Sequence, residues 1–138
     1  MSAVLAMNEE TRRMEQYNDI VANIKPLMIV GKGKNQRVIT GSAVVPLSLC
    51  FVDVRYQGMR THKHLNRLRN KWDERKLTPI ILVWHLEEHR FAIVDGQGRF
   101  IITGEKGIDR LNAIILMDAP EDPDERLKFE AEYFIGQD

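Results

Sequence analysis

Three short apolar runs limit what this chain can fold into. Each is five or six residues long and rich in β-branched or aromatic residues; the runs are Ile80–His85, Arg90–Val94 and Asn112–Met117. Runs of this length, bounded by turn-forming residues, are typical of strands buried in a sheet. Because helix-like segments stand before, between and after them, the sequence predicts an α/β (α+β) fold, with a small mixed sheet and surrounding helices.

Two longer segments have the periodicity of amphipathic helices. The first extends from Asn8 to Ile24 and the second from Arg60 to Lys76. Each has one apolar stripe, which is typical of a helix packed on a core. The stripes consist of Met14, Tyr17, Val21 and Ile24 in the first helix, and of Leu65, Leu68 and Trp72 in the second.

The C-terminal segment predicts a last helix. Asp122 and Glu125 have the spacing of a capping box, and Pro123 stands at the first helical position. The apolar side chains expected to be buried on this helix are Leu127, Ala131 and Phe134. A shorter helix is expected after Arg99, because glycines at positions 104 and 107 interrupt the helical pattern.

The N-terminal part also predicts a β-hairpin. Leu27–Val30 and Arg37–Thr40 are β-rich runs, and a Gly- and Lys-containing loop separates them. Gly41 then predicts a bend. Ala43–Val54 is again strand-like, with Pro46 marking an edge position or a break.

The length suits one domain and is too short for two independent cores. We predict a single domain over residues 1–138: an N-terminal helix and hairpin extension (1–42), a core (43–120) and a C-terminal helix (121–138). The single cysteine, Cys50, excludes an internal disulfide and is expected to be buried. No apolar run approaches the ~20 residues that span a bilayer, and Met1–Met7 lacks a basic leader. We therefore expect a cytoplasmic protein without a membrane partner.

The charge of the chain is balanced in total and unbalanced along its length. The sequence has 20 Lys and Arg residues and 20 Asp and Glu residues. Residues 31–76 hold eleven of the basic residues and three acidic ones, whereas residues 118–138 hold two basic and eight acidic ones. A basic middle predicts an anionic partner if its side chains share a face, and a solvated surface if they do not. The candidate nucleic-acid contacts are Lys32, Lys34, Arg37, Lys63, Arg67, Lys71 and Arg75.

The segment Phe91–Phe100 contains a pattern that suits phosphate binding. An apolar strand leads into a turn whose residues are Asp95, Gly96, Gln97, Gly98 and Arg99. Glycines let backbone amides approach an anion, a helix start adds positive potential, and an arginine side chain holds phosphate oxygens in a bidentate manner. The same two glycines are also compatible with an ordinary tight turn.

The order of these motifs resembles the ParB/sulfiredoxin-like superfamily. The resemblance covers roughly residues 43–135 and rests on six segments in order: Tyr56-Gln57-Gly58, the basic helix, Thr78–Val83, Phe91–Arg99, Gly107-Ile108 and the strand Ala113–Met117. It is closest to phage and mobile-element members and to DndB-like proteins of DNA modification, whose signature is Asp-Gly-Gln-His-Arg. The segment Phe129–Phe134 also resembles the helix that follows this core in such proteins.

Two residues depart from the family pattern. Gly98 stands where the signature has His, and Gly58 stands where many relatives have Arg. Gln97 occupies the position of the catalytic Cys of sulfiredoxins, which excludes that redox activity. In ParB proteins the matching stretch is Gly-Glu-Arg-Arg and contributes to binding cytidine triphosphate, and only Gly96 and Arg99 match it.

The resemblance implies a domain that binds a nucleotide or phosphate group in a DNA-related system such as segregation, a mobile element or DNA modification. The cofactor would be a nucleoside triphosphate with Mg²⁺, and the partners would include DNA and either another protein or a second copy. Arg99 would hold phosphate, with an ion pair to a carboxylate of the tail as its alternative role. Asp95 would cap the turn or coordinate the magnesium-bound phosphate.

Two rival functions use the same residues. One is a nuclease, nucleoside triphosphatase or phosphotransferase, in which Asp95 is the candidate catalytic residue because the imidazole best suited to proton transfer is missing. The other is a non-catalytic protein-interaction domain whose pocket has decayed. The histidine pairs at 62/64 and 85/89 have spacings that metals use, but their expected positions on a helix and beside a hairpin turn predict no metal site.

Overall fold

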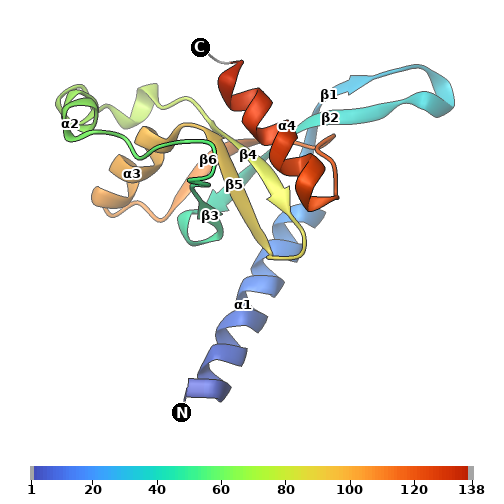
Figure 1. Ribbon diagram of the computed structural model, residues 1–138, viewed down its shortest axis with the longest axis horizontal. Helices are drawn as coiled ribbons and strands as arrows, with labels where there is room; N and C mark the ends of the chain where they lie inside the picture. Colours follow the sequence, from blue (N-terminus) through green and yellow to red (C-terminus); the bar gives the residue numbers. More distant parts are fainter. Residues whose placement is uncertain (1, 137–138) are drawn as a thin grey trace.

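The computed structural model describes residues 2–136 and contains one mixed sheet with helices around it (Figure 1). The helices are α1 (Ser2–Ala22), α2 (His62–Asn70), α3 (Gln97–Glu105) and α4 (Pro123–Ile135). The strands are β1 (Lys25–Val30), β2 (Arg37–Pro46), β3 (Cys50–Phe51), β4 (Ile80–His85), β5 (Arg90–Asp95) and β6 (Arg110–Leu116). The α/β prediction is therefore confirmed.

The sheet has the strand order β1-β2-β6-β4-β5-β3. The two central strands, β6 and β4, run parallel, and so do β5 and β3, whereas the other neighbours are antiparallel. This arrangement places the first residues of β5, Phe91 and Ala92, beside the short edge strand β3. The hairpin of β1 and β2 lies at the opposite edge.

Alternate residues of the central strands enter two separate apolar clusters, as the pleat of a strand requires. Leu82 and Phe91 belong to the larger cluster, into which α1 inserts Tyr17. Val83 and Val94 belong to the smaller one, against which Phe129 of α4 packs. The central strands of the sheet are thus covered on both faces. Because β5 is held between these two layers, the position of the turn that follows it is fixed.

The N-terminal half of the fold differs from its prediction at two points. Helix α1 begins at Ser2 and ends at Ala22, so it starts before the predicted Asn8 and ends before the predicted Ile24. Strand β2 continues through Gly41 without a bend and ends at Pro46. Gly41 is required for another reason: a Cβ atom there would lie 2.7 Å from the Met117 sulfur and would also collide with Ile24.

The basic segment after residue 60 forms a shorter helix than its periodicity predicts. Thr61 caps α2, accepting a hydrogen bond from the His64 amide at 3.2 Å, and the helix ends at Asn70. A separate 3₁₀ turn, Glu74–Lys76, follows it. The break occurs because the Asp73 carboxylate accepts a hydrogen bond from the Arg75 amide at 3.1 Å and caps the new turn.

Helix α4 begins as predicted and buries different residues. Asp122 accepts a hydrogen bond from the Glu125 amide at 3.0 Å, and Pro123 occupies the first turn. The most deeply buried side chains are Arg126 and Glu130, at 4% and 0% exposure, whereas the predicted apolar face is only half-buried. The predicted buried face was wrong, because an apolar stripe in the sequence does not indicate that polar side chains of the sheet and the loops bind this helix. That half-buried face consists of Leu127, Ala131 and Phe134.

Candidate phosphate-binding turn

The segment Asp95–Arg99 forms the connection between β5 and α3. Asp95 is the last residue of β5, and Gly96 caps α3 with a φ of 101°, in the left-handed region that favours glycine. A Cβ atom at Gly96 would lie 2.6 Å from Cγ2 of Ile80 and 2.8 Å from Nη2 of Arg99. Helix α3 begins at Gln97, three residues before the position that the sequence predicted.

Gln97 is buried and bound to the segment that precedes α2. Its exposure is 1%, and that of Gln57 is 4%. Gln97 Nε2 donates to Gln57 Oε1 at 3.2 Å and to the Gly58 carbonyl at 3.0 Å, while its Oε1 accepts from the Arg60 amide at 2.7 Å. Gln57 in turn donates to the Ile93 carbonyl at 2.6 Å. The Gln97 side chain thus holds residues 57–60 over the start of α3, and its amide is engaged within the protein.

Gly98 lies in the contact between α3 and α2. A Cβ atom there would lie 2.5 Å from Cδ1 of Leu68 and 3.4 Å from Nε2 of His64. A histidine side chain at this position would displace α2, which explains physically why this chain departs from the signature. The contact also brings the half-buried imidazole of His64 to the turn. No spacing along the sequence indicates this contact, because it depends on how α2 packs.

Arg99 and Asp95 form an ion pair within the turn. Arg99 Nη2 lies 3.3 Å from Asp95 Oδ2 and donates to the Pro79 carbonyl at 3.2 Å. The side chains remain 25% and 39% exposed, and Arg99 Nε is buried without a hydrogen-bond partner. The carboxylate that Arg99 meets therefore belongs to its own turn, and the predicted alternative of an ion pair with the acidic tail was wrong.

The predicted nucleic-acid contacts fall into two groups at opposite ends of the molecule (Figure 1). One group follows α2 and the 3₁₀ turn, and the other lies on the β1–β2 hairpin; all seven side chains are exposed. Arg75 pairs with Asp73 at 3.1 Å. The two groups do not form one continuous face. The α2 group is Lys63, Arg67, Lys71 and Arg75, and the hairpin group is Lys32, Lys34 and Arg37.

A polar network that the sequence did not reveal lies between α4 and the sheet. Glu130, fully buried, accepts a hydrogen bond from the Tyr56 hydroxyl at 2.8 Å and lies 2.7 Å from His85 Nε2. Burial and the Glu130 carboxylate raise the pKa of Tyr56. Tyr56 immediately precedes residues 57–60, the segment that covers the start of α3. The network therefore holds this segment at its N-terminal end.

Two ion pairs extend this network to the surface. Arg126 binds Glu87 of the β4–β5 turn through both terminal nitrogens, which lowers the pKa of Glu87. The buried Asp53 carboxylate accepts hydrogen bonds from Arg55, with Nη2 at 2.6 Å, and these bonds hold the pKa of Asp53 below its ordinary value. The network joins α4 and Tyr56 to the sheet through His85, whereas the Asp53–Arg55 pair is local to the segment before Tyr56.

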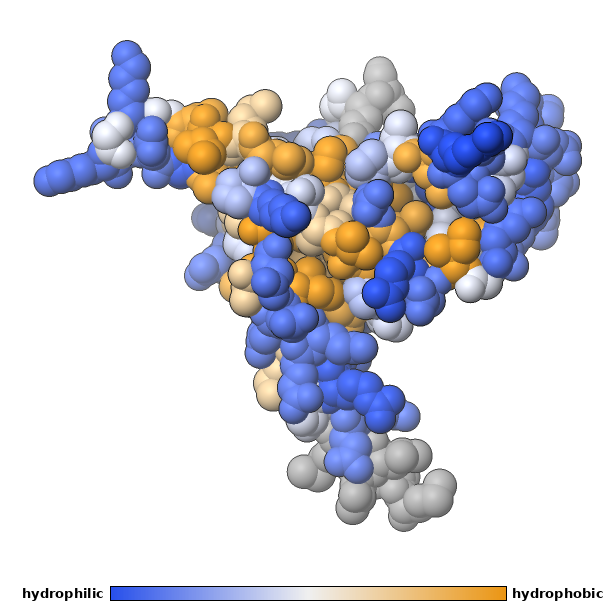
Figure 2. All heavy atoms as spheres, turned by 180° about the vertical axis from the view of Figure 1, so that it is seen from behind, coloured by the Kyte–Doolittle hydropathy of each residue, from blue (hydrophilic) through white to orange (hydrophobic). Residues whose placement is uncertain are grey.

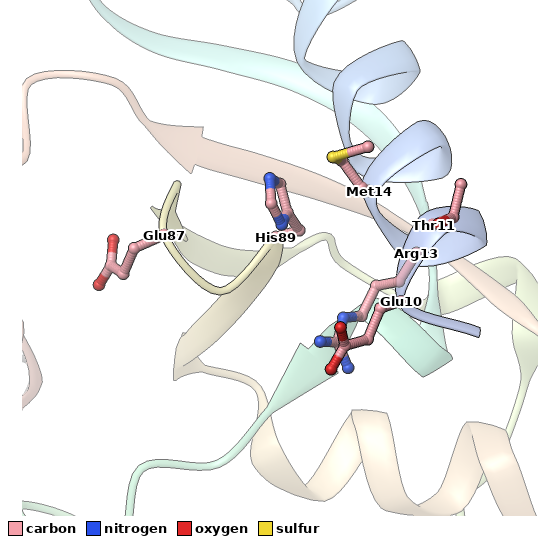
Figure 3. A pocket seen from close by; sticks show the side chains of 6 residues that line it. All are labelled: Glu10, Thr11, Arg13, Met14, Glu87 and His89. Atoms are coloured by element: carbon pink, nitrogen blue, oxygen red, sulfur yellow. The ribbon is translucent and has the colours of Figure 1, made fainter. Parts of the chain in front are cut away.

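A further cavity of about 370 Å³ lies between α1 and the β4–β5 turn (Figure 3). Glu10 and Arg13 line it from α1, and Glu87 and His89 line it from the turn. His89 has a φ of 54° and packs edge-on against Tyr17, with 5.6 Å between the ring centroids. Two carboxylates, one guanidinium and one imidazole line this cavity, a mixed set that indicates no particular ligand.

The remaining sequence predictions can be placed directly. Cys50 is free and buried, and burial raises its pKa to about 12, so it is a core residue. His85 is engaged by Glu130, and within residues 2–136 no cluster of His, Cys, Asp and Glu side chains is arranged to hold a metal ion. None of the helices in that range has the length and hydropathy needed to cross a bilayer.

Comparison with known proteins finds similarity in structure only. No protein-family model and no curated protein sequence matches the chain. The structure of a pNOB8-like ParB N-domain matches 75% of this chain and 37% of its own length, with 14% sequence identity and a TM-score of 0.50. The chain has a ParB-like fold.

A second ParB structure gives a weaker match. The C-terminally truncated chromosome-partitioning protein ParB from Caulobacter crescentus, complexed with CTP-γ-S, matches 65% of this chain and 50% of its own length, with 18% identity and a TM-score of 0.47. The chain thus spans half or less of the length of these two ParB chains.

Proposed function

We propose that the Asp95–Arg99 turn binds the phosphate groups of a nucleotide. The observation that carries this proposal is the state of Arg99: a partly exposed guanidinium at the start of a helix, with a buried Nε that has no partner. The amide groups at a helix start favour an anion, and a planar guanidinium binds phosphate oxygens in pairs. A phosphate that approaches this turn would replace Asp95 as the partner of Arg99.

The roles within the turn differ from residue to residue. Arg99 binds phosphate, and Asp95, once released from Arg99, is the side chain suited to hold the phosphate-bound Mg²⁺. Gly96 supplies the left-handed turn, and Gly98 leaves room for the side chains of α2. Gln97 holds residues 57–60 in place over the start of α3. The ligand class is a nucleoside triphosphate with magnesium, in a DNA-related system such as segregation.

The α2 cations are the part of the basic middle that suits this function. Helix α2 packs on α3, and the ion pair of Arg69 with Glu105, at 2.7 Å, joins the two helices. The exposed cations of α2 therefore belong to the end of the molecule that holds the turn, where they would contact the phosphates of DNA. Binding to duplex DNA should weaken steeply as salt rises, because phosphate contacts release counterions.

Calorimetric titration with the four nucleoside triphosphates in the presence of Mg²⁺ tests the proposal. CTP is the first ligand to use, because one ParB of this fold was solved with a CTP analogue. Arg99→Ala should abolish saturable binding, and Arg110→Ala is the matched control, because Arg110 is also an exposed arginine paired with a neighbouring aspartate. The proposal is wrong if none of the four binds at about 1 mM, or if both variants weaken binding equally.

A second candidate function is phosphate-ester hydrolysis or transfer at the same turn. The observation in its favour is His64, whose imidazole lies beside Gly98 and restores a group able to move a proton near neutral pH. A phosphate-release assay on the wild type, Asp95→Asn and His64→Ala separates the two functions. Equal background rates of phosphate release for all three proteins would rule out the catalytic function. The proposal of nucleotide binding would not be affected by this result.

A further inference from the structure

The β1–β2 hairpin forms an arm that extends from the body of the fold (Figure 1). We define the arm as residues 25–40, which include β1 and the first part of β2. Strand β1 stands at the end of the sheet order and pairs only with β2 among the described residues. Its outer edge therefore presents backbone donors and acceptors to which another strand can bind.

Strand β1 is unusually apolar for an exposed edge. Leu27, Met28 and Ile29 are consecutive in sequence and are 56%, 52% and 56% exposed. In Figure 2 apolar side chains gather where the arm joins the body, and hydrophilic ones lie beyond them. Edge strands are usually protected by charges or proline within the strand. Here Lys25 and Pro26 stand only at its beginning, so the middle of the edge is open.

The arm is also purely cationic. No Asp or Glu occurs between Asp19 and Asp53, an interval that spans the whole arm. Four basic side chains are exposed on the arm, and none of them forms an ion pair within residues 2–136. Such a surface attracts a partner with carboxylate or phosphate groups. The four side chains are Lys25, Lys32, Lys34 and Arg37.

A cavity of about 630 Å³ borders the same strand. Leu27 of β1 lines it together with Val44 of β2 and Ile114 of β6, and Ile20 of α1 closes one side. Val44 is itself 53% exposed. The cavity lies over one face of β1, β2 and β6, and Leu27 forms its rim on β1. An apolar side chain on the same face of a strand beside β1 would pack on Leu27, so backbone pairing and side-chain contact are available together.

We propose that the β1 edge binds an extended peptide in which acidic and apolar side chains alternate. The peptide would add a strand to the sheet next to β1. Main-chain hydrogen bonds would hold it, an apolar side chain would pack on Leu27 at the rim of the cavity, and its carboxylates would meet Lys25 and the lysines of the arm. This partner is separate from the nucleotide turn, which lies at the other end of the molecule.

Two other occupants fit the arm less well. Pairing of β1 with β1 of a second copy would bring two purely cationic arms together without a carboxylate between them. DNA would satisfy the cations, but its phosphates offer nothing apolar to the three consecutive side chains of β1. An acidic and apolar peptide matches both properties of the strand.

Selection from a displayed library of random peptides of about twelve residues, with the full chain as bait, tests this inference. We expect enriched peptides that alternate acidic and apolar residues, and β1 amides whose hydrogen exchange slows when such a peptide binds. Two variants, Leu27→Asp/Ile29→Asp and Lys32→Glu/Lys34→Glu, should each weaken binding about tenfold or more. The matched control is Val54→Asp, which charges an exposed apolar residue, 70% exposed, away from the arm.

Four results would overturn the inference. They are the absence of enriched peptides, enriched peptides that are basic, binding that neither arm variant weakens, and slowed exchange that excludes β1. A dimer that Leu27→Asp/Ile29→Asp converts to a monomer would assign the edge to a second copy instead. Duplex DNA that protects β1 amides where selected peptides do not would assign it to DNA. Arg99→Ala should leave peptide binding unchanged, so the outcome is independent of the nucleotide turn.

Discussion

Two loops of this protein share a composition and differ in what surrounds them. The arm contains Gly31-Lys32-Gly33-Lys34, and the core contains Gly96-Gln97-Gly98-Arg99. In the core, a Cβ atom on either glycine would collide with packed side chains, and Gln97 is bonded to three neighbours. In the arm, Gly33 has nothing within 4 Å of a Cβ atom, and its lysines are exposed. Two glycines with nearby cations are therefore not by themselves a phosphate site. Whether they form one depends on the side chains packed around them.

Among the variants that test this comparison, Gly98→His is expected to lower the free energy of unfolding most. Gly98→His places a side chain against Leu68 and His64, and overpacking of this kind costs about 1–3 kcal/mol. We expect a value near the upper end, because α2 must move as a whole. The same change in the arm, Gly33→His, should cost less, since only the left-handed φ of 55° opposes it. Chemical denaturation of both variants checks the order, and equal losses would contradict it.

A smaller loss is expected for Gln97→Ala. The change removes one partner of the buried Gln57 side chain and the partners of the Gly58 carbonyl and the Arg60 amide, which belong to exposed residues. The expected cost is about 1–2 kcal/mol. The matched variant in the arm is Gln36→Ala, which removes an exposed amide and should stay within about 0.5 kcal/mol of the wild type. If Gln97→Ala is equally harmless, the covering segment 57–60 is held by something other than the Gln97 amide.

Acid should destabilise the core through Asp53. Hydrogen bonds from Arg55 hold the folded-state pKa of this carboxyl below its ordinary value, so its stabilising contribution is present above about pH 4 and is lost as the pH falls further. Asp53→Asn should therefore lose less free energy of unfolding than the wild type between about pH 5 and about pH 3. Parallel pH dependence of the two proteins would show that this pair contributes nothing. The arm contains no carboxyl group that could titrate in this range.

The smallest effect is expected for Lys32→Ala/Lys34→Ala. Both side chains are exposed and have no partner in the described structure, so the free energy of unfolding should change by no more than about 0.5 kcal/mol. Nucleotide binding should also be unchanged. A loss of nucleotide affinity in this variant, measured by calorimetry, would show that the arm takes part in the nucleotide site.

The sequence predicts the helices and strands of this fold better than the contacts between them. The strands Ile80–His85 and Arg90–Val94 and the cap at Asp122 follow from local composition, and they are found with at most one residue of difference. The sequence also draws attention to the Asp95–Arg99 turn. It does not indicate that Gln97 points into the protein, because that depends on residues about forty positions away in the chain.

The wrong expectations have a common physical cause. Periodicity cannot distinguish a continuous helix from α2 followed by a capped 3₁₀ turn, since Asp73 competes locally for the backbone. It also cannot reveal that Arg126 and Glu130 are buried, because a charged residue is buried only where partners await it. Those partners come from other segments: Glu87 binds Arg126, and His85 and Tyr56 bind Glu130. Contacts between distant segments decide these features.

The most direct test of the central claim is a titration of the isotope-labelled chain with CTP and Mg²⁺, followed amide by amide in NMR spectra. If the core turn binds phosphate, the amides of Gly96, Gly98 and Arg99 should shift and saturate, while those of Lys32 and Lys34 stay in place. Shifts confined to the arm, or no shifts at any residue at about 1 mM CTP, would contradict the account.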